Sequence, residues 1–299
     1  MDGILIINKP AGITSHDVVW RARKILHDER TGHTGTLDPF ATGVITVLVG
    51  RATRLAQFLD KDTKEYEAIV RFGFETTTGD RTGKPKSVPN PELQVIKEDV
   101  EDVLPEFQGE IEQMPPMFSA KKVKGKKLYE LARKGIEIER KPVKVTIHEI
   151  EMSETEQKLD NTEVAIRVVC SAGTYIRVLA EDIGKKIGIG AHLAELNRTR
   201  SGVFELSKAI TLEELKEIAA KNEVGKFLIP MNEAISHLPK TKLTGEQLEK
   251  THHGNKLKYD GDDVKNGDFV RLVDENDDLV AVGAYDESDK SVQPKIVFI

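Results

Sequence analysis

The chain has 299 residues, 38% of them hydrophobic and 31% charged, so it is long enough for one large domain or for a main domain with a smaller one. Its single cysteine, Cys170, excludes an intrachain disulfide, and no apolar run approaches the roughly 18 residues of a membrane helix, so we expect a cytoplasmic protein. The net charge of −6 argues at first against a nucleic-acid partner, but 8 Lys/Arg and 13 Asp/Glu fall within residues 241–299, which leaves the rest nearly neutral.

Apolar runs and turns alternate in the first quarter of the chain. Residues 3–7 follow an acidic residue and predict a buried strand rather than a signal peptide. Residues 14–26 carry apolar side chains at helical spacing behind a Thr-Ser cap, which predicts a helix. A glycine-punctuated loop is expected at residues 32–44. A β-branched strand, a short helix and another strand follow at residues 44–50, 52–62 and 64–74.

Strands and helices continue in mixed order through the middle of the chain. The expected elements are a surface loop at 75–92, a helix at 97–107, an extended piece with a turn and a short helix at 114–135, strands at 143–152 and 162–170, a loop opening a helix at 171–188, and a strand at 191–206. This order predicts an α+β fold with a mixed, largely antiparallel sheet flanked by helices.

The character of the chain changes near Pro239. Short strands, expected at 268–274, 278–286 and 295–299, alternate with turns, as is typical of a small β-barrel. We therefore predict a main domain at residues 1–237 and a small β-barrel domain at residues 238–299.

Several common catalytic motifs are missing from the sequence. The stretch GDRTGKP lacks the spacing and the Ser or Thr of a Walker loop, and there is no GxGxxG, HExxH or GxSxG. With one cysteine, a structural zinc site is not expected. Nucleotide hydrolysis, zinc catalysis and serine hydrolysis are therefore excluded.

Asp38 is the single carboxylate in GHTGTLDPFATGV, Gly32 to Val44. The glycines of this stretch allow a ligand to approach the backbone closely, and the absence of a second acid excludes the carboxylate pair of glycosidases. A lone aspartate acts as a covalent nucleophile where a fixed cation keeps it ionised. The alternative is a loop aspartate that only accepts backbone N–H bonds.

Six ordered blocks resemble the tRNA pseudouridine-55 synthase family, and together they cover nearly all of the first 240 residues. The blocks are KPAGITSHDVV (Lys9 to Val19), GHTGTLDPFATGV, KEYEA (Lys64 to Ala68), MPPMFSAKKVKGKKLYELAR (Met114 to Arg133), CSAGTYIRVLAEDIG (Cys170 to Gly184) and HLAELNRTRSG (His192 to Gly202). The resemblance implies that a uridine at position 55, in the T loop of tRNA, is flipped out and isomerised to pseudouridine. It also implies that neither a cofactor nor a metal takes part.

The same resemblance implies roles for individual residues. Asp38 is the expected nucleophile, and it either attacks C6 of the base or acts on the ribose as a glycal forms. The expected substrate-binding residues are Arg177, which pairs with Asp38; Tyr66, which stacks on the base and helps to remove the C5 proton; Tyr175 and Leu196, which line the uracil pocket; His33, near the vacated base; and Lys9, which supports the loop. Phe118 and Asn197 depart from the family pattern, where tyrosine and arginine are common.

The expected partner is the T-arm stem-loop of tRNA, bound by a monomer. Residues 119–144 hold ten Lys/Arg and three Asp/Glu, which is either a solvated face or part of an RNA-clamping segment at about 114–144, as the resemblance implies. The tail resembles a small RNA-binding, PUA-like barrel. Two other functions remain open: an RNA-binding or RNA-folding protein without catalysis, and a synthase acting on ribosomal RNA. The Asp38, Tyr66 and Arg177 set argues against the first as the only role, and a tRNA-folding role beside catalysis is compatible with it.

Overall fold

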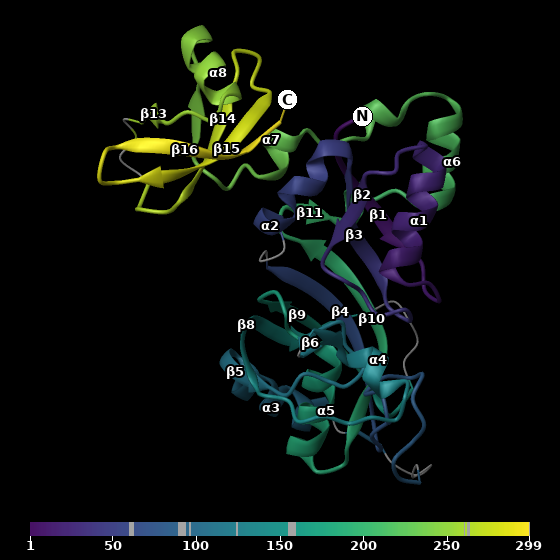
Figure 1. The fold of residues 1–299 in the computed structure, drawn as a ribbon. Coiled ribbons are helices and arrows are strands. Elements are labelled where there is room, and N and C mark those ends of the chain that lie inside the picture. The colour runs from purple at the N-terminus through teal and green to yellow at the C-terminus, as the bar shows by residue number, and fades with distance from the viewer. Residues whose placement is uncertain are drawn as a thin grey trace.

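The computed structural model describes residues 1–59, 63–88, 94–95, 97–123, 125–154, 160–259, 261 and 264–298. A nine-stranded sheet runs in the order β1-β3-β10-β4-β9-β8-β5, with β2 paired to β3 and β11 paired to β10 (Figure 1). Its strands are β1 (Gly3–Lys9), β2 (Thr31–Thr34), β3 (Thr42–Val49), β4 (Lys64–Phe72), β5 (Gly109–Gln113), β8 (Val143–Met152), β9 (Glu163–Cys170), β10 (Ala191–Ser201) and β11 (Phe204–Glu205). Within this sheet, the short β3–β10 pairing is the only parallel one among the strand pairings that the described residues form.

Alternating side chains of β1 and β3 pack into two separate hydrophobic cores, one on each face of the sheet. Leu5 and Ile7 of β1 point to one face, where α1 (Ser15–Leu26) and α6 (Leu212–Ala220) cover them, whereas Ile4 and Ile6 point to the other face. The helix α1 begins at a capping box, in which Thr14 and Asp17 satisfy each other's backbone N–H groups.

The other half of the large sheet is covered on one face by α5 (Ile176–Ile187) and α3 (Lys97–Val103). Shorter elements complete this part of the chain: α2 (Ala56–Leu59), α4 (Leu128–Ala132), the β6 (Lys122–Val123) and β7 (Lys126–Lys127) hairpin, and the 3-10 helices η1 (Gly50–Leu55), η2 (Leu104–Phe107), η3 (Leu206–Lys208) and η4 (Val224–Lys226). A shared core therefore fixes α5 relative to β4, β9 and β10.

A second sheet, of five strands, lies at the C-terminal end of the chain, beside α2 and α7 (Met231–Ala234) (Figure 1). It runs in the order β12 (Lys240–Lys242), β14 (Phe269–Val273), β15 (Leu279–Asp286), β16 (Ser291–Val297) and β13 (Leu257–Lys258), with α8 (Gly245–His252) packed against it. The sheet curls into a half-barrel with β12 and β13 at its ends.

The predicted α+β class, with a largely antiparallel mixed sheet and a small C-terminal β structure, is confirmed. Four strands were not predicted. In the large sheet, β2 forms within the expected loop because it pairs with β3, and β5 forms because it pairs with β8. In the C-terminal sheet, β12 pairs with β14 and β13 pairs with β16. Parts of the predicted elements, at 60–62, 89–92 and 299, lie outside the described residues. The division into domains at residues 237 and 238 stays a prediction. In the described part of the chain, no helix is both long and apolar enough to span a membrane.

Candidate active site

The loop that carries Asp38 crosses a fork in the large sheet. Both β10 and β2 pair with the edge of β3 opposite β1, β10 at Thr42 and Gly43 and β2 from Thr46 onward. Residues 35–41 connect β2 to β3 across this fork. Leu37 and Phe40 of the loop are buried in the core beneath β4 and α5, so the chain on both sides of Asp38 is anchored.

The N-terminal segment holds the same loop through hydrogen bonds. The Ser15 hydroxyl accepts a bond from the backbone N–H of Leu37 (2.9 Å) and donates to its carbonyl (3.2 Å). The ammonium of Lys9 donates to the carbonyl of Pro39 at 3.2 Å. Both backbone groups of Leu37 and the carbonyl of Pro39 are thereby satisfied, which restrains Asp38 between them.

Arg177 contacts both oxygens of the Asp38 carboxylate, through one hydrogen bond and one close ion-pair contact. Its Nε lies 2.8 Å from Oδ2 of Asp38, and its Nη2 lies 3.1 Å from Oδ1. This is the bidentate geometry that gives arginine–carboxylate pairs both strength and direction. The carboxylate is therefore held in one orientation, and its side chain remains 32% exposed.

The arginine is itself fixed from several sides, with only 4% of its side chain exposed. Its Nη1 donates to the carbonyl of Thr78 (2.9 Å) and its Nη2 donates to the carbonyl of Phe118 (2.7 Å). Asp80 lies 3.8 Å from Nη1, so two carboxylates flank one guanidinium. Arg177 belongs to the first turn of α5, and the buried Gln113 side chain bonds both backbone groups of Tyr175 just before that turn.

Opposing influences set the protonation of Asp38. Burial raises the pKa of its carboxyl above the ordinary 3.8, Arg177 acts most strongly in the opposite direction, and Asp80 adds to the rise. The ion pair thus offsets part of the desolvation cost, as a nucleophilic carboxylate requires.

A cavity of about 230 Å³ opens beside Asp38. This volume lies below the roughly 300–1,000 Å³ of drug-sized sites and suits a single base. The cavity brings together five of the seven predicted site residues, which are Asp38, Tyr66, Tyr175, Arg177 and Leu196. Tyr66 comes from β4 and Leu196 from the neighbouring β10, and each is only 7% exposed. An aromatic ring and an aliphatic side chain therefore line the cavity that the carboxylate also lines.

Two predicted residues do not line this cavity. His33 lies in β2, opposite Val47 of β3. Lys9 is fully buried beneath the loop, and its ammonium donates to three backbone carbonyls, those of Pro10, Ile13 and Pro39. Burial lowers the pKa of Lys9 to about 8. Its place is under the loop, and the substrate-binding assignments of both residues stay predictions.

Four buried polar residues of the site were not predicted. Lys64, Ser119 and Arg198 line the cavity and Asp80 flanks Arg177, and all four are buried. Lysines and arginines on an amphipathic strand are usually solvent-facing, so their sequence positions gave no signal. Asp80 lies in the stretch expected to be a surface loop, where acidic residues are common. Within the described residues, no group of three or more His, Cys, Asp or Glu side chains is arranged to hold a metal ion.

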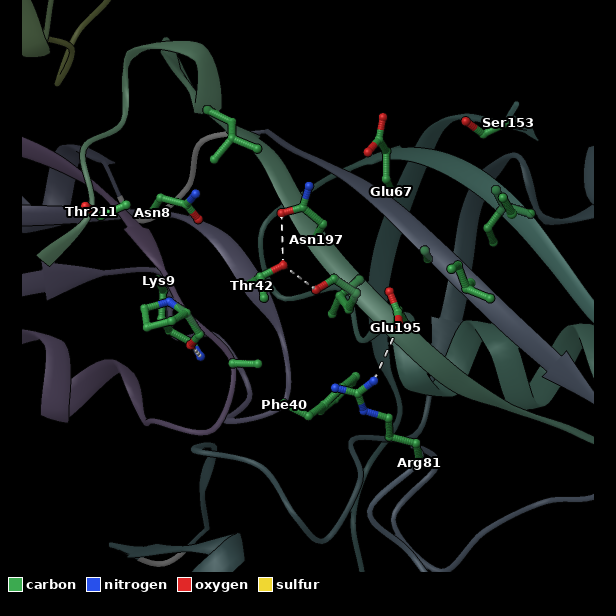
Figure 2. Close-up of a pocket in the computed structure, with 18 of the residues that line it drawn as sticks. Asn8, Lys9, Phe40, Thr42, Glu67, Arg81, Ser153, Glu195, Asn197 and Thr211 are labelled. Carbon is green, nitrogen blue, oxygen red and sulfur yellow. Dashed lines mark hydrogen bonds and ion pairs between the residues drawn. The ribbon is translucent and has the colours of Figure 1, made fainter. Parts of the chain in front are cut away.

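A larger cavity, of about 890 Å³, lies on the opposite face of the sheet (Figure 2). Glu67 lines it whereas the adjacent Tyr66 lines the Asp38 cavity, because successive strand residues point to opposite faces. In this cavity the Thr42 hydroxyl donates a hydrogen bond to the side-chain oxygen of Asn197 (3.1 Å), and Arg81 forms an ion pair with Glu195 (3.5 Å); Figure 2 shows both contacts. The larger cavity is lined by four carboxylates, whose negative charge disfavours a phosphate backbone: Glu67, Glu154, Glu195 and Glu213. The smaller cavity is therefore the candidate active site.

Family models match the chain over most of its length. Residues 23–176 match the TruB family pseudouridylate synthase N-terminal domain, and residues 177–236 match the tRNA pseudouridylate synthase B C-terminal domain. The chain is 47% identical over 259 residues to tRNA pseudouridine synthase B of Bacillus pumilus, covering 85% of this chain and 82% of that protein. It is 44% identical over 284 residues to the Bacillus cereus protein of the same name, covering 94% and 92%.

Solved structures agree with these matches. A crystal structure of a Cbf5–Nop10–Gar1 complex contains a chain with a TM-score of 0.77 and 32% identity, covering 99% of this chain and 85% of that one. An H/ACA RNP bound to a substrate RNA containing 2′-deoxyuridine gives a TM-score of 0.76 and 29% identity, with the same coverage. The class of protein is thereby defined as a pseudouridine synthase, which is an isomerase. The chain belongs to the TruB family of pseudouridylate synthases.

Proposed function

We propose that the protein converts uridine 55 in the T loop of tRNA to pseudouridine, with Asp38 as its single catalytic carboxylate. The observation that carries the proposal is the bidentate Arg177–Asp38 pair beside a cavity that suits one base. The names of the Bacillus relatives support tRNA as the substrate. We further propose that the enzyme works in the cytoplasm as a monomer, without cofactor or metal.

The reaction moves one bond within the nucleoside. The N1–C1′ bond breaks, the uracil turns in its pocket, and a C5–C1′ bond forms. The C5 hydrogen leaves as a proton and N1 takes up a proton, so the product is an isomer of the substrate. No group departs to water, so one carboxylate is enough. The ionised Asp38 either adds to C6 of the base or acts on the ribose as a glycal forms, and either route needs the carboxylate that Arg177 holds.

The uridine must leave its stack to reach Asp38. Extruding a base costs a few kcal/mol, least where it is unpaired in a loop, and stacking on an aromatic side chain recovers part of that cost. Tyr66 and Leu196 supply the two sides of such a slot, and Tyr175 lies at the N-terminus of α5 beside it. We assign base recognition to these three residues.

RNA contact beyond the base is proposed for the clamping segment at about 114–144. Within the described residues, five basic side chains of this segment form no ion pair: Lys121, Lys126, Arg133, Lys134 and Lys141. Arg140 and Lys144, by contrast, pair with Glu137 and Glu110. Lysines near phosphates give affinity that falls steeply with salt. The C-terminal sheet, in the proposed RNA-binding domain 238–299, carries a net acidic charge, which limits it to a narrow RNA contact.

Tritium release tests the proposal. T-arm stem-loops carrying [5-³H]uridine at position 55 should release tritium when treated with the protein, and anticodon-arm stem-loops and ribosomal RNA hairpins should not. Release from the ribosomal hairpins at an equal rate would favour a synthase of another RNA. Binding to every RNA without release would favour an RNA-binding or RNA-folding protein.

A further inference from the structure

Arg198 is among the largest fully buried side chains, with 1% of its surface exposed. It lies in β10, and its guanidinium donates to the carbonyl of Val44 (2.8 Å) and to the carbonyl of Gly35 (2.7 Å). Val44 belongs to β3 and Gly35 begins the loop that carries Asp38. A buried charge is stable only when its donors are satisfied, so this geometry is strongly constrained.

Gly35, which begins the Asp38 loop, and Gly43, which follows the loop in β3, both lie too close to Arg198 to carry a side chain freely. A Cβ at Gly35 would lie 3.2 Å from Nη1 of Arg198, and a Cβ at Gly43 would lie 2.3 Å from its carbonyl oxygen. The backbone φ values at these glycines are +63° and +100°, a region that other residues rarely adopt. Arg198 therefore contacts the loop where it leaves β2 and where it enters β3.

The same guanidinium faces Tyr66. The two residues are direct cross-strand partners in the β4–β10 register, and both line the Asp38 cavity. Burial raises the pKa of the Tyr66 phenol, and the hydrogen bond and charge of Arg198 oppose that rise. Lys64, whose ammonium donates to the Ser201 hydroxyl at 2.9 Å, and Cys170 lie in the same buried region.

We propose that Arg198 is a positioning residue that holds the Tyr66 ring in register with the Asp38 loop, so that a base stacked on Tyr66 meets the carboxylate. The inference rests on the proposed function, since it needs the base to stack on Tyr66. Arginine suits the task because its planar fork presents five donors in fixed directions. A lysine at this position presents one point charge and cannot serve Gly35, Val44 and Tyr66 together.

The first test replaces Arg198 with lysine, and Arg200→Lys is the matched control. Arg200 is two residues further along β10, and it pairs with Glu65 outside the cavity. Arg198→Lys should bind the T-arm stem-loop with unchanged affinity and lower kcat by about 100-fold, the size expected for a misplacement of roughly 1 Å. Arg200→Lys should leave kcat within about threefold. A loss confined to KM, or equal losses in the two variants, would overturn the proposal.

A double-mutant cycle with Tyr66→Phe separates this role from a general effect on packing. If Arg198 acts through the phenol oxygen, Tyr66→Phe lowers kcat with little change in KM, and adding Arg198→Lys lowers it no further. Losses that multiply would contradict the proposal. If Arg198→Lys does not fold, the Tyr66→Phe variant alone tests the proposal. A wild-type kcat in Tyr66→Phe would then overturn the positioning role of Arg198. An inactive wild type would instead contradict the proposed function.

Discussion

The proposed reaction requires the Asp38 carboxylate to remain charged, although burial favours its neutral form. The structure meets this requirement with one arginine whose own freedom is removed by the carbonyls of Thr78 and Phe118. A solvated arginine at the same distance would be screened and mobile, and would contribute little. The ion pair with Arg177 therefore orients the Asp38 carboxylate as well as favouring its charged form.

The direction of the Asp38 pKa leads to a pH prediction. Only the ionised carboxylate is nucleophilic, so kcat falls as the pH drops through the pKa of Asp38. Because burial raises that pKa, the acidic limb of the kcat profile should lie above 3.8. Arg177→Gln removes the main opposing influence and should move the limb further upward. Single-turnover rates measured across the acidic range check this, and a limb that moves downward in the variant would contradict it.

At the residue scale the sequence supported Tyr66 and Arg177 only through the order of the family blocks, whereas Asp38 was also supported by its place as the single carboxylate in a glycine-rich loop. Taken singly, each has an ordinary structural explanation. Arg198 and Asp80 could not be predicted, because nothing in a strand or loop pattern distinguishes a charge that will be buried from one that will be solvated.

At the scale of elements, the loop of Asp38 depends on a chain segment far from the cavity. Ser15, 2% exposed at the start of α1, bonds both backbone groups of Leu37. Because β2 and β10 both occupy the same edge of β3, the loop between them has little sheet support of its own. The sequence predicted α1 and its cap, but the bond to Leu37 depends on the tertiary fold.

Ser15→Ala should loosen the loop without removing any group from the cavity. Leaving the Leu37 N–H and C=O unsatisfied should cost about 1–3 kcal/mol of stability. We expect faster hydrogen exchange at the Leu37 amide and a lower kcat, with RNA affinity unchanged. Ser207→Ala, on an exposed serine, is the control. Unchanged exchange at Leu37 would contradict the anchoring role.

Gly43→Ala should break the junction between the two halves of the sheet. A Cβ there would lie 2.3 Å from the carbonyl oxygen and 2.6 Å from the amide nitrogen of Arg198, which is backbone that cannot move aside. Gly109→Ala is a matched control, since its φ of +102° is nearly the same and nothing lies within 4 Å of its Cβ. Both variants carry about 1–2 kcal/mol of backbone strain. Chemical denaturation should show a larger loss for Gly43→Ala, and equal losses would contradict the steric account.

At the scale of the whole molecule, the C-terminal sheet shares a core with the large sheet. Ile4 and Leu48 of the large sheet and Val282 and Phe298 of the C-terminal part belong to one buried cluster. Phe58 meets Phe269 edge to face, with ring centroids 4.9 Å apart. The two sheets are therefore packed together rather than connected only by a linker. The sequence predicted strands in the tail, but not which of their apolar faces would meet the main body.

Phe298→Ala tests this shared core. Truncating a buried phenylalanine typically costs about 3–5 kcal/mol, and Phe298 is 6% exposed. Calorimetry of the wild type should show one transition, because both sheets depend on the same cluster, and the variant should unfold at a lower temperature. Phe227→Ala, on a ring that is 42% exposed, should change stability by no more than about 0.5 kcal/mol. Two separate wild-type transitions would contradict the shared core.

The most direct measurement is tritium release from a T-arm stem-loop carrying [5-³H]uridine, with the wild type and Asp38→Asn. The variant keeps the size of the side chain and removes its charge, and circular dichroism and RNA binding verify that it is folded and binds its substrate. We predict release by the wild type and none above background by Asp38→Asn. Appreciable turnover by the folded variant would contradict Asp38 as the catalytic carboxylate.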